Sequence, residues 1–461
     1  MQAWQSAAEI ADAVATGRSS ALAVVQAALG RIRSRDRVLN AFTAVTDQRA
    51  LARARAVDLA RADGRAVGPL AGVPFAVKNL FDVAGLPTLA GSKINRARSP
   101  AERDAPLISR LEAAGAVLVG ALNMGEYAYD FTGENVHYGA SRNPHDPAHM
   151  AGGSSAGSAA SVAGGLVPFS LGSDTNGSIR VPSSFCGLFG LKPTYGRLSR
   201  AGSFPLAASL DHVGPLARST RDLGLAYDAM LGYDASDPVC VDRPAEPVLP
   251  SLEAGTSGLR IVTAAGYFKR GASPAVEQAL ARVAAVLAAA KEIDLPEVAR
   301  ARAAAYVITA AEGAALHLDR LRRQAGDFDP FVRNRLIAGA MLPAPLVVAA
   351  QKFRRWYRRE VLKLFQSVDA ILAPATPFTA PRLGQQTVWL DGIEMPLRPN
   401  IGIFTQPISF IGLPVVAVPV PLQPLPIGVQ IIAPPWREDL ALRIAYTLEK
   451  AGVALAPRPT A

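Results

Sequence analysis

Residues 152–182 constrain the fold and the chemistry of this chain more than any other segment. They contain two glycine-rich turns that carry serines, Gly-Gly-Ser-Ser at 152–155 and Asn-Gly-Ser at 176–178, separated by an Ala/Ser-rich helical run and a short apolar strand. Because glycine adopts positive φ and has no side-chain volume, such turns can direct successive backbone N–H groups into one cavity. The segment therefore predicts closely packed turns that bind an anion or an oxyanion.

A phosphate-binding loop and a tight strand-to-helix connection are the other interpretations of this segment. The pattern G-x-x-x-x-G-K-[ST] is absent and no lysine follows either turn, which disfavours a phosphate loop. With Ser154, Ser178 and the closing run Ser-Ile-Arg-Val-Pro, the segment resembles the amidase signature. Ala156 and Asn176 stand where that family commonly has glycine. The resemblance covers nearly the whole chain and is thin only between residues 235 and 365.

Lys78 closes an apolar, strand-like run at residues 69–80, in a chain where only 8 of the 48 basic residues are lysines. Such a lysine commonly extends its amine to the surface. If it is buried without a carboxylate partner, its pKa falls and the neutral amine can serve as a base. Both interpretations are open from the residues alone.

Composition excludes several classes of protein. The net charge of +10 arises from scattered arginines rather than a basic block, which disfavours nucleic-acid binding as a function. The two cysteines fit a reducing cytoplasm, and neither they nor the five histidines show a metal-ligand spacing, so we expect no metal and no cofactor. There is no G-x-S-x-G elbow. Residues 401–436 are uncharged but contain eight prolines, which argues against a membrane helix.

Helix-like and strand-like segments alternate along the chain. The length allows one large domain or two smaller ones, and the alternation favours a single α/β domain over residues 1–461. The resemblance implies an α/β/α sandwich with a large central mixed β-sheet covered by helices. Within it we expect an N-terminal helical layer at 1–65 with caps at Ser6, Ser19 and Asp47, a catalytic core at 66–235, a variable substrate-side helical region at 236–365, and C-terminal core strands and a helix at 366–461.

The resemblance also implies a Ser-Ser-Lys triad. In the matching positions, Ser178 is the nucleophile, Ser154 relays the proton from a cis peptide bond, and Lys78 is the final base. The implied oxyanion hole consists of the backbone N–H groups of Thr175, Asn176, Gly177 and Ser178. Asp174 and Arg180 flank the nucleophile and are expected to brace its turn. In the segment at 209–219, His212 replaces a glutamine that is common in the family.

For the substrate, Tyr306 and Arg335 resemble positions that bind the polar end of the substrate in glutamine-using relatives, although Arg335 also fits a solvated helix residue. The expected reaction is hydrolysis of a C–N bond in a small urea-like or carboxylated amide, as in the 1-carboxybiuret hydrolase type of the family. Two alternatives are the glutamine-hydrolysing component of a tRNA-dependent amidotransferase and a catalytically silent assembly protein. Expected partners are a small accessory protein in a hetero-oligomer, or a second copy in a homodimer, without a membrane.

Overall fold

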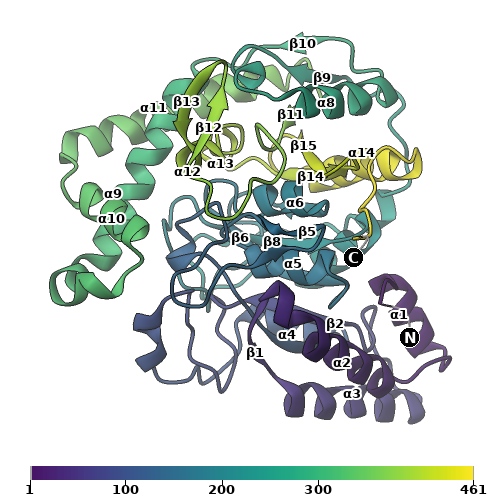
Figure 1. Cartoon of the computed structure of the whole chain (residues 1–461). Coiled ribbons are helices and arrows are strands. Elements are labelled where there is room, and N and C mark those ends of the chain that lie inside the picture. Colours follow the sequence, from purple (N-terminus) through teal and green to yellow (C-terminus); the bar gives the residue numbers. More distant parts are fainter. Residues whose placement is uncertain (1–2, 460–461) are drawn as a thin grey trace.

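The computed structural model describes residues 3–459 and is organised around one mixed sheet of 11 strands (Figure 1). The strands lie in the order β1-β3-β2-β6-β8-β7-β14-β15-β11-β9-β10. Their bounds in chain order are β1 Phe42–Val45, β2 Pro74–Lys78, β3 Val117–Leu122, β6 Phe169–Asp174, β7 Phe189–Lys192, β8 His212–Ala217, β9 Ile261–Ala264, β10 Glu292–Ile293, β11 Ala370–Pro374, β14 Val415–Val420 and β15 Ile427–Ile432. Two hairpins lie outside this sheet, β4 Arg142–Asn143 with β5 Asp146–Met150 and β12 Thr387–Leu390 with β13 Ile393–Pro396.

Helices cover both faces of the sheet, which confirms the predicted sandwich (Figure 1). On one face α5 and α6 contact each other and the central strands, and on the other face α4, α7 and α14 pack in a row. The helices of the body are α1 Ala7–Ala15, α2 Ala21–Leu39, α3 Asp47–Ala62, α4 Pro106–Ala113, α5 Ala156–Ala163, α6 Arg180–Cys186, α7 Thr220–Met230, α8 Pro274–Val286, α12 Leu397–Asn400, α13 Gln406–Ser409 and α14 Glu438–Lys450.

The central strands are apolar over their whole length because both of their faces are covered. Every residue of β2 and of β6 is buried, and the two strands run parallel to each other. The rings of Phe75 and Phe169 stack across this pair with centroids 5.5 Å apart. This pairing brings the ends of β2 and β6, and therefore Lys78 and the turn after Asp174, to the same edge of the sheet.

Three helices form an arm at the left of Figure 1, namely α9 Val298–Gln324, α10 Pro330–Ala340 and α11 Ala344–Leu364. The helix α9 packs against α10, α11 and α13. In the chain, α13 follows the arm and precedes the sheet strand β14. The arm corresponds to the region where the family resemblance is thin. Within residues 3–459 no single helix is long and apolar enough to cross a membrane, and α10 and α11 meet that test only as a pair bent by 97°.

The helix starts near the N-terminus agree with the sequence prediction in part. Ser6 caps α1, since its side chain accepts a hydrogen bond from the N–H of Glu9. The cap of α2 is Ser20 rather than Ser19, and α3 begins at Asp47 itself without a side-chain cap. The errors are one residue each because neighbouring serines and an Asp in the first turn satisfy the same local pattern.

Candidate active site

Lys78 is the last residue of β2 and is completely buried. Its Nζ lies 2.6 Å from Ser154 Oγ and 2.9 Å from Ser173 Oγ. Burial lowers the pKa of Lys78 to about 7, although nearby carboxylates oppose this change, because a charged amine loses its hydration in the interior. Of the two interpretations left open by the sequence, the structure therefore excludes the surface lysine.

The turn before α5 holds Ser154 against Lys78. The Gly153–Ser154 peptide bond is cis, in agreement with the geometry that the resemblance implied. The next residue, Ser155, donates through Oγ to the carbonyl of Ser173 at 3.1 Å and accepts from the Ser173 N–H at 3.2 Å. These two hydrogen bonds join the turn to the end of β6, so both turns of the 152–182 segment lie at one place.

Residues 175–178 form the turn between β6 and α6, and Ser178 at its end borders a cavity. Within residues 3–459, none of the backbone N–H groups of this turn donates a hydrogen bond. Buried N–H groups are nearly always paired. Consecutive free donors beside a serine are therefore suited to bind an oxygen that becomes negatively charged. Gly177 has a φ of 140° and its Cα faces the side chain of Thr405, which leaves no room for a Cβ.

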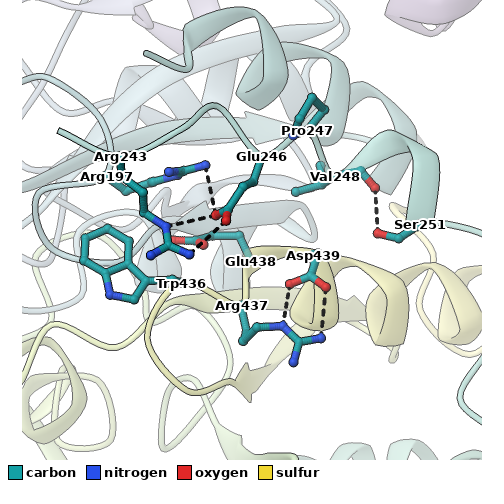
Figure 2. A pocket seen from close by; sticks show the side chains of 10 residues that line it. All are labelled: Arg197, Arg243, Glu246, Pro247, Val248, Ser251, Trp436, Arg437, Glu438 and Asp439. Carbon is teal, nitrogen blue, oxygen red and sulfur yellow. Dashed lines mark hydrogen bonds and ion pairs between the residues drawn. The ribbon is translucent and has the colours of Figure 1, made fainter. Parts of the chain in front are cut away.

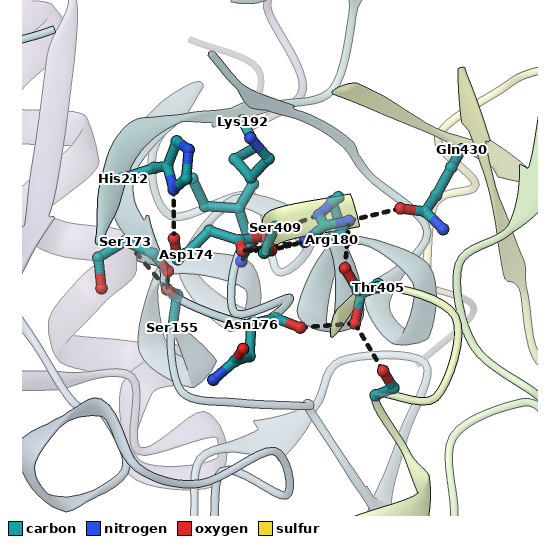
Figure 3. A network of polar contacts seen from close by, with 12 residues as sticks. Ser155, Ser173, Asp174, Asn176, Arg180, Lys192, His212, Thr405, Ser409 and Gln430 are labelled. Atoms are coloured by element: carbon teal, nitrogen blue, oxygen red, sulfur yellow. Dashed lines mark hydrogen bonds and ion pairs between the residues drawn. The ribbon is translucent and has the colours of Figure 1, made fainter. Parts of the chain in front are cut away.

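Asp174 and Arg180 join the two ends of this turn through a completely buried ion pair (Figure 3). The guanidinium binds both carboxylate oxygens at 3.0 Å and also donates to Gln430 Oε1 at 2.6 Å and to the carbonyl of Thr405 at 3.2 Å. Burial alone would raise the pKa of Asp174, but the charge of Arg180 holds it well below its ordinary value. The carboxylate also accepts from the N–H of Ile179 at 3.2 Å, so the contacts match the expected bracing arrangement.

His212 and Lys192 lie on the other side of Asp174 (Figure 3). The Nδ1–H of His212 donates to the carbonyl of Leu210 at 2.7 Å and lies 3.1 Å from that of Asp174. Burial lowers the pKa of both side chains, to about 7 for Lys192. The Lys192 amine donates to the carbonyl of Pro193 at 3.0 Å. The sequence analysis did not assign Lys192 to this region, although Lys192, like Lys78, is the last residue of a buried strand, β7.

The cavity beside Ser178 is bounded by the turn at 175–178, the loop at 128–131 and the arm. Tyr306 and Arg335, the two residues expected to bind substrate, both line it. Arg335 donates through Nη1 to the carbonyl of Tyr129 at 2.9 Å and lies over the Tyr129 ring. The hydroxyl of Tyr306 donates to the carbonyl of Pro399 at 2.8 Å. Arg335 is therefore half-buried at the cavity and is not a solvated helix residue.

The structure brings most of the expected residues together, with one exception. Lys78 contacts Ser154, and Ser178 adjoins Asn176 and Arg335 at the cavity. Within the described residues, however, the hydroxyls of Ser154 and Ser178 do not form a hydrogen bond. Further residues that the sequence did not single out also reach the site, among them Ser173, Phe131 and Gln406.

A larger cavity of about 260 Å³ lies elsewhere, between residues 197–251 and the start of α14 (Figure 2). Its charged side chains neutralise one another, since Arg243 pairs with Glu246 and Arg437 with Asp439. None of the expected site residues lines it. The cavity beside Ser178 is therefore the candidate active site.

Comparison with known proteins agrees with this geometry. The family model described as Amidase matches residues 23–442. The chain is 52% identical to AtzE of Pseudomonas sp. (strain ADP), which belongs to a 1-carboxybiuret hydrolase, over 97% of this chain and 98% of that protein. It is 39% identical to the GatA-type component of the glutamyl-tRNA(Gln) amidotransferase of Azotobacter vinelandii (strain DJ / ATCC BAA-1303), over 96% of both chains.

Among solved structures, one of an unexpected vestigial protein complex, reported to reveal the evolutionary origins of an s-triazine catabolic enzyme, superposes with a TM-score of 0.97. Its chain is 51% identical, and the match covers 98% of this chain and 100% of the other. Family model, relatives and fold lead to the same assignment over nearly the full length. The chain belongs to the amidase family.

Proposed function

We propose that this amidase-family hydrolase, which acts on carbon–nitrogen bonds other than peptide bonds, cleaves a small carboxylated, urea-like amide, with 1-carboxybiuret as the best candidate. The observation that carries the proposal is the buried Lys78 amine, 2.6 Å from Ser154 Oγ, with a pKa lowered to about 7. A neutral amine in contact with a hydroxyl is a general base at neutral pH.

In this proposal Ser178 Oγ attacks the substrate carbonyl carbon while its proton passes through Ser154 to Lys78. The backbone N–H groups of residues 175–178, which have no acceptor in the described structure, stabilise the oxyanion of the tetrahedral intermediate. The C–N bond then breaks, Lys78 returns the proton through Ser154, and ammonia leaves. Water attacks the resulting acyl-enzyme by the same route and releases the acid. The Ser154–Ser178 contact must tighten in the substrate complex, as catalytic hydrogen bonds commonly do.

Arg335 supports the carboxylated part of the proposal. Its guanidinium lines the cavity and, among residues 3–459, donates a single hydrogen bond, through Nη1 to Tyr129, so the remaining N–H groups are available for a carboxylate. The name of the relative that is 52% identical specifies a carboxylated biuret. A carboxylate at one end and an amide at the other would fit Arg335 and Ser178 respectively.

A second candidate function is the glutaminase half-reaction of a tRNA-dependent amidotransferase, favoured by the 39% identity to a component of such an enzyme. The test is ammonia release by the purified chain from 1-carboxybiuret, biuret, glutamine and a simple aliphatic amide. Release from 1-carboxybiuret without a partner or tRNA supports the first function. Release from glutamine only when partner proteins and charged tRNA are present supports the second.

The alternative of a catalytically silent assembly protein is tested by a serine-directed fluorophosphonate. We expect the probe to label the wild-type chain and to leave Ser178→Ala unlabelled, since that change removes a single hydroxyl from a turn fixed by other residues. Absence of labelling in both proteins, together with absence of turnover, contradicts the hydrolase mechanism.

We further propose a small accessory protein as a partner of this chain. The name of the relative that is 52% identical describes one component of a larger enzyme, and the solved structure with a TM-score of 0.97 comes from a complex. Co-purification of the tagged chain from its native host, followed by mass determination in solution, distinguishes a hetero-oligomer from a homodimer.

A further inference from the structure

The side chain of Asn176 has one orientation that satisfies its surroundings. Its Nδ2 donates to Thr309 Oγ1 at 2.9 Å, and Thr309 Oγ1 donates to the carbonyl of Ala305 at 2.8 Å. Because the hydroxyl of Thr309 has a single hydrogen and uses it on Ala305, it offers only lone pairs to Asn176. The amide group that faces Thr309 must therefore be the NH₂ of Asn176, and the carbonyl Oδ1 faces away from α9.

This orientation leaves Asn176 Oδ1 without a partner. Asn176 is 6% exposed, and its Oδ1 is buried without a hydrogen bond within residues 3–459. The backbone carbonyl of Asn176 is satisfied, because Thr405 Oγ1 donates to it at 2.8 Å. Native proteins seldom bury an unpaired acceptor, and the exceptions need a specific explanation. Here the unpaired group belongs to a residue that borders the cavity next to Ser178.

The position of Asn176 relative to the reacting groups suggests what this acceptor binds. A carbonyl attacked by Ser178 would direct its oxygen toward the free N–H groups of residues 175–178 and its leaving nitrogen toward Ser154 and Lys78. The third substituent of the carbonyl then occupies the cavity that Ser178 and Asn176 both line, and Thr309 on α9 holds the Asn176 side chain there. An acceptor at this place distinguishes a third substituent that is N–H from one that is CH₂.

We propose that Asn176 Oδ1 accepts a hydrogen bond from an N–H bonded to the acyl carbon of the substrate, and so makes the site selective for urea-type acyl groups over carbon acyl groups. Asn176 is then a specificity-determining residue, and Thr309 is the positioning residue that fixes its amide. The inference rests on the proposed function, because it assumes amide cleavage at Ser178. Asn176 also stands where the related family commonly has glycine, which has no acceptor of this kind.

The test compares biuret with malonamide, which replaces the central N–H of biuret by CH₂ and keeps the same number of heavy atoms. The readout is kcat/KM for ammonia release from each substrate. For each variant, the ratio of kcat/KM for biuret to kcat/KM for malonamide is compared with the same ratio for the wild-type protein. Asn176→Leu retains the size and removes the acceptor, so we expect this ratio to fall about tenfold, the value of one hydrogen bond. Asn176→Ala is a second variant in case leucine prevents folding, and melting temperatures monitor both.

Thr309 provides the matched pair of controls. Thr309→Val removes the lone pairs that orient Asn176 and should lower the ratio, whereas Thr309→Ser keeps them and should preserve it. If Asn176→Leu and Asn176→Ala lower kcat/KM equally for both substrates, so that the biuret-to-malonamide ratio is unchanged, the inference is overturned while the proposed function stands. If the wild-type protein hydrolyses neither substrate nor 1-carboxybiuret and is not labelled by fluorophosphonate, the proposed function itself fails.

Discussion

The rate of hydrolysis should follow the neutral fraction of Lys78 as pH is varied. Burial lowers the pKa of this amine to about 7, so it is mostly neutral above pH 7 and mostly protonated below. Because the proposed base must be neutral, protonation removes activity. We expect log kcat/KM to rise by one unit per pH unit below pH 7 and to level off above it, so that activity at pH 5 is about 100-fold below the plateau.

Two other buried groups titrate in the same range and serve as controls. Burial lowers the pKa of Lys192 to about 7 and raises that of Glu126 to about 7. Within residues 3–459, neither side chain forms a hydrogen bond with Ser154. Lys192→Met and Glu126→Gln should therefore keep the midpoint near pH 7 even if they alter the plateau.

The assay is initial-rate ammonia release between pH 5 and pH 9, with far-UV circular dichroism at each pH to confirm that the chain is folded. A profile without a step between pH 5 and pH 9 would refute the assignment of Lys78 as the base. If the step disappears or moves in Lys192→Met or Glu126→Gln, the pH dependence belongs to the mutated residue and not to Lys78. Near-normal turnover by Lys78→Arg would also contradict the reasoning, since guanidinium does not deprotonate in this range.

Three further predictions concern single residues. Arg335→Ala should lower kcat/KM for a carboxylated amide by about ten- to a hundredfold, the value of a charge-assisted contact, and should leave kcat/KM for a neutral amide nearly unchanged. Arg335→Lys should recover part of the loss, whereas equal losses for both substrates would limit Arg335 to a packing role. Arg180→Met leaves the Asp174 carboxylate buried without its partner and should lower the free energy of unfolding by about 3–5 kcal/mol in urea titrations, whereas a loss below about 1 kcal/mol would show that the pair does not stabilise the turn. Gly177→Ala should abolish hydrolysis, because the added Cβ would meet the Thr405 side chain at a backbone φ of 140°, and full activity of this variant would contradict the packing argument. The control Gly30→Ala in α2, where a Cβ has open space, should gain about 0.5–1 kcal/mol of stability.

Local patterns predicted the parts of the site that are contiguous in the chain. The apolar run that ends at Lys78, the two serine turns and the strand between them occur as expected, because strand burial and glycine turns depend on nearby residues. Family resemblance added the cis bond before Ser154. The one-residue error at Ser19 and Ser20 arises because a local pattern does not select between adjacent caps.

Contacts between distant segments could not be predicted in the same way. The hydrogen bond from Asn176 to Thr309 joins residues far apart in the chain, and nothing in either neighbourhood indicates it. Gln406 lines the cavity from α13, a short helix that packs against α9. Family resemblance singled out Arg335, but the residues alone did not distinguish it from a solvated arginine, and only the packing of α10 places it beside Tyr129. Tertiary packing, not local preference, decides these positions.

The arm also has a consequence for how this fold changes over generations. Thr309 lies on α9 and Arg335 on α10, whereas Lys78 and Ser178 belong to the sheet and its turns. One part of the cavity wall, which includes Tyr306 and Arg335, is therefore encoded in a single uninterrupted stretch, residues 298–364. Recombination or drift confined to that stretch replaces part of the surroundings of a bound molecule while the sheet is inherited intact, so a lineage can alter what it binds without rebuilding its catalyst.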